Sequence, residues 1–470
     1  MKISLIQPGR NNLKYLKWSY ESIRRNQGNH TVEICVADDN STDGTWKWAQ
    51  KMMRKDPHFI AIKNPYGVRL GHTILYDELV KVSSHDICMI YHADMYLCPG
   101  ALDAIEQNIK EGTIVSLTRI EPPLHPDGPE KVIADFGIEP EEFREREFLK
   151  WFEGPVDSTG GYQPKHDGPT EGIFAPWAFY KKDFQEINGH DPLFAPQSKE
   201  DSDIFNRFQL NGVKFTQTWE GCVYHMTCRG SRFADGAKRN PDGKVFMKNR
   251  ETDEWLAQNE RSTRNFIRKW GHFCKHDNLM KPIIPPKFEI GILLSNCTLE
   301  LVKLLEPWCS ILYTCPNTVD DYLFEEQSNT IVNLKEKLQI YSKDNEQPDI
   351  LIQVNKDNQF TNQDFGYIQQ MPEIINNDIE NLSKELPCEF ELGNLKITIN
   401  DINNINDILI TCGGLLKNKM EPDVEGWETF VTYLKNKAVG EKGMEEDYND
   451  PKTIGSNSVE NPGRGKYFGV

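Results

Sequence analysis

The sequence predicts an α/β protein whose first half forms a mostly parallel, doubly wound sheet and whose second half adds a smaller α/β domain. Short apolar runs alternate with amphipathic stretches from residue 2 to residue 91, which is typical of strands that alternate with helices. A proline-dense segment at 281–287 separates the two halves. Polar signatures follow two of the apolar runs, at the strand ends where open α/β sheets bind ligands.

The elements follow from hydrophobic periodicity and turn residues. In the first half we expect strands at 2–7, 32–37, 59–63, 87–91, 173–180 and 214–219. The helices expected there are 15–25, 42–54, 70–82, 201–211 and 251–276, with one more at 141–152 inside a polar insertion at 121–170. Beyond the prolines we expect strands at 290–294, 310–314 and 349–354, helices at 299–305 and 364–383, and a hairpin at 389–400. The predicted parts are a first domain at 1–246, a helical extension and linker at 247–287, a small α/β domain at 288–415, and an acidic, polar tail at 416–470.

Length and composition limit the class of protein. A chain of 470 residues is too long for one ordinary domain. It contains no run of 18 apolar residues, so we expect no transmembrane helix. The N-terminus becomes polar too soon for a signal peptide, and the eleven cysteines include no Cys-x-x-Cys pair. We therefore expect a cytoplasmic protein with free thiols.

The net charge of −17 is concentrated in the second half. Residues 281–470 contain 31 acidic and 17 basic residues, a net charge of −14, with Arg464 as the only arginine. Nucleic acid binding normally needs a basic face, so this part is a poor candidate for it. It shows no chemical motif, and we expect it to serve assembly, such as oligomer formation, or partner docking.

Asp38 and Asp39 follow the second predicted strand. A carboxylate at this place can accept hydrogen bonds from a nucleobase or from ribose hydroxyls. The alternative is turn chemistry, because the segment 39–44 is also rich in turn-forming residues.

His92 and Asp94 close the most apolar strand. An unpaired buried carboxylate is costly, and a divalent cation that joins Asp94 to a diphosphate would remove that cost. His225 follows the last predicted strand of this domain and offers an imidazole ligand. The alternatives are a capping carboxylate and a packed histidine. Mn²⁺ or Mg²⁺ is the expected cofactor.

Two arginines and two carboxylates complete the candidate site. Arg229 and Arg232 can grip a diphosphate, or they belong to a solvated loop. Glu200 and Asp201 begin a predicted helix, where acidic residues are also favoured as simple caps. A carboxylate here that faces a hydroxyl group could act as a general base.

Taken together and in this order, the signatures resemble family 2 glycosyltransferases, which have the GT-A (Rossmann-like) fold. The resemblance covers residues 1 to about 246 and rests on the segments 7–11, 38–45, 64–75, 92–94, 187–191 and 200–207. It implies a nucleotide-sugar site that includes Pro8, Arg10, Asp38, Asp39, Arg69, His92, Asp94, Arg229 and Arg232. It also implies Asp201 as the base, with Glu200 beside it, and makes 121–170 an insertion on the acceptor side. His92 departs from the family's Asp-x-Asp metal motif.

The predicted function is therefore metal-dependent, inverting transfer of a sugar from a UDP-, GDP- or dTDP-sugar to a hydroxyl acceptor. The whole combination is also similar to glycosyltransferases carried by marine tailed phages, which would place it in the host cytoplasm. The alternatives are a nucleotidyltransferase on a similar fold, a retaining glycosyltransferase, and a sugar-binding or scaffolding protein on a decayed enzyme fold. The acidity of the chain disfavours a nucleic acid acceptor.

Overall fold

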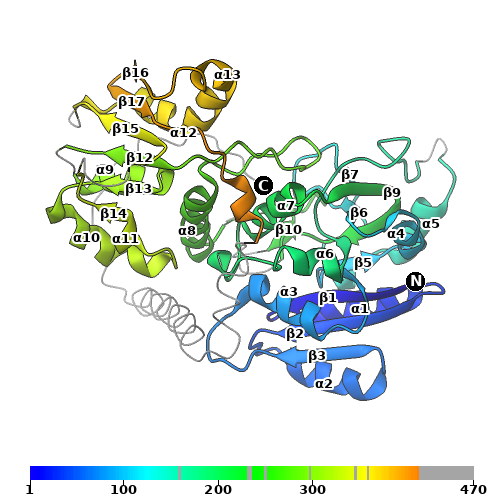
Figure 1. Cartoon of the computed structure of the whole chain (residues 1–470). Helices are drawn as coiled ribbons and strands as arrows, with labels where there is room; N and C mark the ends of the chain where they lie inside the picture. The colour runs from blue at the N-terminus through cyan, green and yellow to red at the C-terminus, as the bar shows by residue number, and fades with distance from the viewer. Residues whose placement is uncertain are drawn as a thin grey trace.

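The computed structural model describes residues 1–156, 160–229, 236–247, 251–295, 298–342, 347–356 and 359–411. It contains two large sheets, with helix α8 (Asp253–Trp270) between them (Figure 1). The predicted tail at 416–470 and Arg232 lie outside the described residues. No helix in the described ranges is long and apolar enough to cross a bilayer.

The first sheet has the strand order β3-β2-β1-β4-β8-β6-β9-β5, with β7 paired to β6. Strands β1 to β4 are parallel where they pair, whereas β8 runs antiparallel to β4 and β6, and β5 antiparallel to β9. Its strands are β1 (Lys2–Gly9), β2 (Thr31–Asp38), β3 (Phe59–Lys63), β4 (Ile87–Ile90), β5 (Met95–Leu97), β6 (Thr113–Glu121), β7 (Lys131–Ile133), β8 (Trp177–Tyr180) and β9 (Lys214–His225). The predicted α/β class with a mostly parallel sheet is confirmed.

Helices cover both faces of this sheet, so neighbouring residues of a central strand enter different cores. Leu5 packs in one core cluster and Ile6 in the other. The helices are α1 (Leu13–Asn26), α2 (Thr45–Lys55), α3 (Gly71–Val82), α4 (Ala101–Asn108), α5 (Glu145–Glu153), α6 (Lys181–Glu186) and α7 (Glu200–Leu210). A small hairpin, β10 (Ala237–Arg239) and β11 (Val245–Met247), follows β9 in the chain.

Several elements differ from the expectation. Strand β9 continues to His225 instead of ending at 219, because a register shift at Leu117/Thr118 lets β6 and β9 pair again beyond it. Strand β8 is shorter than the predicted 173–180. Helix α8 ends at Trp270 instead of 276, and Gly271 is its C-cap, with a φ of +79° that is typical of glycine there. Strand β5, helix α4 and strand β6 were not expected.

Within the expected insertion at 121–170, helix α5 packs through an aromatic cluster. Phe148 is fully buried there against Phe136, Phe143 and Tyr224. Tyr224 also donates a hydrogen bond from its hydroxyl to the carbonyl of Gly137, at 2.6 Å. The described part of the insertion is therefore fixed to strand β9, close to His225.

The second sheet has the order β14-β13-β12-β15-β17-β16. Its first four strands repeat the pattern of β3-β2-β1-β4, and all are parallel. The elements are β12 (Ile290–Leu293), α9 (Leu299–Leu305), β13 (Ile311–Tyr313), α10 (Pro316–Glu326), α11 (Leu334–Lys337), β14 (Leu338–Gln339), β15 (Ile350–Val354), α12 (Asn362–Asn377), α13 (Ile379–Leu382), β16 (Cys388–Leu392) and β17 (Leu395–Ile399). The expected hairpin is β16–β17.

Candidate active site

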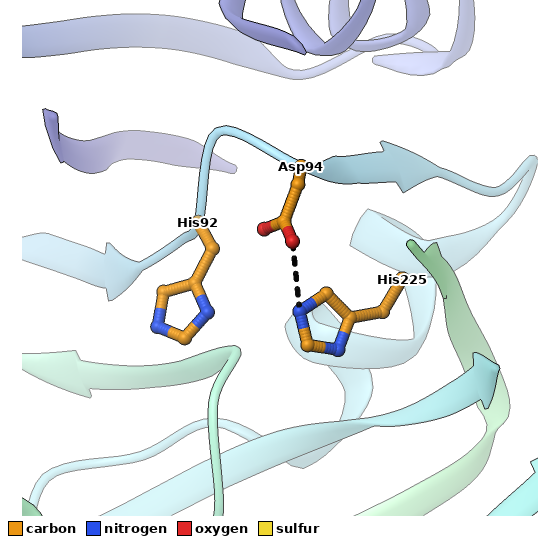
Figure 2. A group of neighbouring side chains, drawn as sticks. All are labelled: His92, Asp94 and His225. Carbon is orange, nitrogen blue, oxygen red and sulfur yellow. Dashed lines mark ion pairs between the residues drawn. The ribbon is translucent and has the colours of Figure 1, made fainter. Parts of the chain in front are cut away.

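Three side chains that can bind a metal meet where strand β4 ends. His92 and Asp94 lie between β4 and β5, and His225 is the last residue of β9. The pairing of Met95 with His225 brings the two segments together. One ligand atom from each of the three side chains lies within 4.8 Å of the others. The Asp94 carboxylate points to the His225 ring, with Nε2 and Oδ2 3.4 Å apart, and the His92 ring lies beside them (Figure 2).

Charge compensation keeps this buried cluster ionised. Burial would raise the pKa of Asp94, but the charge of His225 lowers it to about 2. Burial would lower the pKa of His225, but Asp94 and Glu121 raise it to about 9. Glu121 accepts a hydrogen bond from Nδ1 of His225 at 2.9 Å, and Lys131 lies 3.1 Å from its other oxygen. His225 is therefore held from both sides by carboxylates.

The cluster has the ligand chemistry of a divalent cation site. Burial lowers the pKa of His92 to about 4, so this imidazole is neutral and can bind a metal at neutral pH. Two imidazoles and one carboxylate suit Mn²⁺ better than Mg²⁺, which prefers oxygen ligands. Binding would release the proton that His225 otherwise holds. The sequence had placed Asp94 and His225 as metal ligands and His92 as a donor contact only.

Asp39 fastens the loop before helix α3. Its Oδ1 accepts hydrogen bonds from the Asn64 amide at 2.6 Å and from the Leu70 N–H at 3.1 Å. Its Oδ2 accepts from the Gly71 N–H at 2.9 Å. Gly71 has a φ of +75°, and a Cβ there would lie 2.0 Å from the carbonyl oxygen of Pro196. The predicted nucleoside ligand thus also has a structural role.

Asp38 is buried beside it with a different set of contacts. Its Oδ1 accepts from the Ser41 N–H at 3.2 Å, and Oδ2 has no hydrogen-bond partner among the described residues. The same is true of Gln7 Oε1 and the Tyr91 hydroxyl. Pro8 lies half-buried at the end of the paired strand β1. Unpartnered buried polar atoms at a strand end are the atoms that a bound polar ligand can satisfy.

The predicted arginines differ in their surroundings. Arg10 is exposed. Arg69 donates to Gln197 at 3.0 Å and lies 3.2 Å from Glu254 on helix α8. Arg229 donates to the Ile138 carbonyl and lies over the ring of Tyr15, 5.4 Å from its centroid. Its positive charge also contributes to lowering the pKa of Asp94.

A cleft of about 300 Å³ lies at the start of helix α7. His92 and Arg119 line it together with Glu200 and Asp201, whereas Asp94 and His225 are not among its lining residues. The carboxylate of Asp201 is exposed to solvent in the cleft, although protein atoms surround it. His92 of the candidate metal cluster and the predicted base Asp201 thus line one cavity.

Glu200 and Asp201 are neighbours with opposite surroundings. Glu200 is buried, and its Oε1 lies 2.5 Å from Nε2 of His72. The protein atoms around the cleft raise the pKa of Asp201 to about 6 by limiting its solvation, and the negative charge of Glu200 adds to this. Burial also opposes ionisation of Glu200, but His72 keeps its pKa below the usual range. Asp201 is therefore the carboxylate that titrates near neutral pH.

The sequence did not identify several cleft residues. Arg119 lies at the end of β6, 3.5 Å from Glu121, with its guanidinium over the ring of Phe174. His72 is 128 residues from its partner Glu200. Trp255 and Asn259, on helix α8, line the cleft as well. The sequence predicted the helix that carries Trp255 and Asn259, but not its position at the cleft, because the contacts of the cleft residues depend on the tertiary fold.

Residues 4–163 match the model of the family described as glycosyl transferase family 2. This segment is about a third of the chain and contains the predicted nucleoside and metal residues up to Asp94. The match is to this segment alone, and it confirms the glycosyltransferase class that the sequence predicted.

Solved structures show a weak likeness. The crystal structure of S. aureus TarS 1-349 is 14% identical, with a TM-score of 0.33, over 48% of this chain and 60% of that one. GalNAc-T7 with UDP, GalNAc and Mn²⁺ is 14% identical, with a TM-score of 0.34, over 48% of this chain and 43% of that one. The match thus spans less than two thirds of either protein. No curated protein matches this sequence significantly.

Proposed function

We propose that this protein is an inverting glycosyltransferase that uses a divalent cation to move a sugar from a nucleotide-sugar donor to a hydroxyl acceptor. The observation that supports the proposal most directly is a cleft lined by His92, from the candidate metal-ligand cluster, and by the titratable carboxylate Asp201. Sugar transfer needs charge neutralisation on the leaving diphosphate and a base on the acceptor hydroxyl. The cluster would supply the first and Asp201 the second.

The donor would lie along the ends of strands β1, β2 and β4. Asp38 and Pro8 would contact the nucleoside, and the loop before α3 that Asp39 holds would flank it. Asp94, His225 and His92 would hold the cation. When bound, the cation supplies positive charge to the diphosphate. Arg229, near Asp94, can add a guanidinium to the same end.

Asp201 is the proposed general base. In its ionised form it would accept the proton of the acceptor hydroxyl as that oxygen attacks the anomeric carbon, while the bond to the diphosphate breaks on the opposite face. Attack from the opposite face inverts the configuration. Glu200 stays ionised through His72 and keeps the pKa of its neighbour high enough for the task.

A panel of sugar nucleotides tests the proposal. TarS has been solved with UDP-GlcNAc, so UDP-sugars are tested first, followed by GDP- and dTDP-sugars. The purified protein should hydrolyse at least one donor with Mn²⁺ and lose this activity in EDTA, and the released sugar should have the inverted configuration. Release of pyrophosphate from a nucleoside triphosphate and a sugar phosphate would instead support a nucleotidyltransferase. Nucleotide-sugar binding with no turnover would support a non-catalytic binding protein.

A further inference from the structure

Helix α8 connects the cleft with the second sheet. Trp255 and Asn259, in its first half, line the same cleft as His92. Asn259 also accepts a hydrogen bond from the Ser198 hydroxyl at 2.7 Å, and Gln258 donates to the carbonyl of Gln197 at 3.1 Å. These two hydrogen bonds attach helix α8 to the loop that immediately precedes helix α7 and Asp201. The helix therefore contributes both a wall of the cleft and a support for the base.

The second half of α8 carries a buried ion network that fixes it to the second sheet's domain. Arg268 lies 2.7 Å from both Glu306 and Glu326 and is almost fully buried. Arg264 makes two hydrogen bonds to Glu326, at 2.8 and 3.0 Å. Breaking a buried ion pair leaves an unpaired charge inside the protein, so separating α8 from the second domain would cost free energy. The next residue, Lys269, faces the first domain instead.

The contacts of Lys269 fasten the same turn of helix to the first domain. Its ammonium lies 2.7 Å from Asp191 and 2.6 Å from Asp203. Trp270 donates to Asp203 at 2.9 Å. Adjacent residues of one helix are thus bound to both domains, so the position of the Trp255 wall depends on residues far beyond the family match.

The part of the cleft formed by α8, α7 and the loop before α7 has mixed chemistry. Besides the Trp255 ring, it offers amide and hydroxyl side chains. These are Gln197, Ser198, Ser202, Asn206 and Asn259. Charges of both signs line the same cleft: Lys199 and Lys275 are cations, Glu200 and Asp201 are carboxylates, and Lys275 is paired with Glu373. A sugar ring has one apolar C–H face for an aromatic ring and hydroxyls for neutral hydrogen-bonding groups.

Size and charge both limit the occupant. A cavity of about 300 Å³ is at the small end of ligand sites, which suits one or two sugar residues better than a folded protein. A nucleic acid would need a line of cations for its phosphates, whereas the cations Arg119, Lys199 and Lys275 share this cleft with the carboxylates Glu200 and Asp201.

We propose that the Trp255 face of helix α8 is the acceptor subsite, that it takes a neutral carbohydrate, and that the second domain acts in transfer by holding this helix in place. The proposal rests on the glycosyltransferase function proposed above. It gives the second domain a part in transfer without requiring any catalytic residue there.

The first experiment uses Trp255→Ala and Trp255→Phe with the donor found in the panel and with neutral disaccharides as acceptor probes: lactose, maltose, cellobiose and chitobiose. Trp255→Ala should raise the acceptor KM about ten-fold, and Trp255→Phe should restore most of it. The Kd for UDP with Mn²⁺ should not change, because the nucleoside edge is untouched. An unchanged acceptor KM in Trp255→Ala would overturn the subsite. Transfer to hydroxymethylated DNA or to a serine peptide, with none to the saccharides, would overturn the acceptor class.

The second experiment separates positioning from contact. Arg264→Met removes the Arg264–Glu326 pair between α8 and the second domain and leaves the Arg268–Glu326 pair in place. Lys303→Met removes the exposed Lys303–Glu325 pair within the second domain, as a matched control. Arg264→Met should raise the acceptor KM several-fold without changing the Kd for UDP, and Lys303→Met should change neither. Equal acceptor KM values in the two variants would overturn the role of the second domain. A wild-type protein that hydrolyses no sugar nucleotide would overturn the proposed function itself.

Discussion

At the residue scale, Glu200 and Asp201 show how burial divides two adjacent carboxylates between two roles. Glu200 is buried against His72, whereas Asp201 opens to the cleft. The buried residue keeps its charge because a histidine is 2.5 Å away. The negative charge of Glu200 helps to raise the pKa of Asp201 to about 6.

We expect Asp201→Asn to slow transfer by about 10²–10⁴-fold, because loss of a general base typically costs this much. The Kd for UDP and the dependence on Mn²⁺ should stay normal. The wild-type rate should fall as the pH drops below about 6, since Asp201 must be deprotonated to accept a proton. Glu200→Gln should be less impaired and should move this acid limb to lower pH, because it removes a neighbouring negative charge.

A kcat/KM profile from pH 4.5 to 9 measures both effects. Transfer by Asp201→Asn at the wild-type rate would contradict the assignment of the base. A product that keeps the donor's anomeric configuration would contradict the inverting mechanism.

Asp94 allows a second test at the residue scale. Asp94→Ala should abolish the gain in nucleotide diphosphate affinity that Mn²⁺ gives, because it removes the one carboxylate of the cluster and one of the two carboxylates that contact His225. Asp86→Ala is the matched control, since Asp86 is exposed and lies at the opposite end of the same strand. Calorimetry with UDP, with and without Mn²⁺, measures the difference. Equal Mn²⁺-dependent affinities in the two variants would remove Asp94 from the metal site.

At the element scale, the start of helix α3 depends on a carboxylate from strand β2. Asp39→Ala leaves the buried N–H groups of Leu70 and Gly71 without their acceptor. We expect this variant to lose about 1–3 kcal/mol of stability in urea unfolding and also to bind UDP more weakly. Asp38→Ala should weaken UDP binding with a smaller loss of stability, since Asp38 accepts only one such bond. A stable Asp39→Ala variant that binds no nucleotide would mean that Asp39 contacts the nucleoside directly.

Local patterns were enough to predict the elements that the chain specifies by itself. Strand β3 has the predicted bounds, and the hairpin β16–β17 forms around Gly393 as expected. The polar residues after β2 and β4 were recognisable because strand ends collect ligands in this class of sheet. Strand β9 was cut short because its last residues pair only after a register shift, which no periodicity shows.

The parts of the site that the sequence did not reveal all depend on contacts between distant segments. The Glu200–His72 pair joins two helices, and Arg119 gains its meaning only from the neighbouring Phe174 and Glu121. The attachment of α8 to Glu306 and Glu326 requires two domains to be placed first. Such pairs leave no spacing in one sequence from which they could be inferred.

At the scale of the whole molecule, the second domain is attached too closely to be a free appendage. After β17 the chain returns to the first domain, where Leu409 packs with Phe194 and Trp270, and Asn188 donates to the Thr411 carbonyl at 3.1 Å. The two sheets are therefore expected to unfold in one cooperative transition.

A truncation to residues 1–280 tests this attachment. It should retain the Kd for UDP but lose transfer to saccharides, and its stability should fall by about 3 kcal/mol or more, because Arg268 loses both carboxylate partners. Adding Arg268→Met to the truncation should recover part of that stability by removing the unpaired charge. Thermal unfolding of the full chain and of both truncated forms measures the difference. A truncation as stable as the full chain that still transfers to saccharides would contradict the role of the second domain.

The close contact at Gly71 has a consequence for how this enzyme can change over generations. The N–H of Gly71 binds Asp39, which adjoins the proposed nucleoside site, and Gly71 also contacts Pro196, in the loop before the proposed base Asp201. A methyl group at position 71 would collide with Pro196. Substitution of Gly71 is therefore not tolerated unless the loop at 196 changes first. Selection for new donors or new acceptors would have to proceed around this point, so the two specificities can diversify separately only while glycine stays between them.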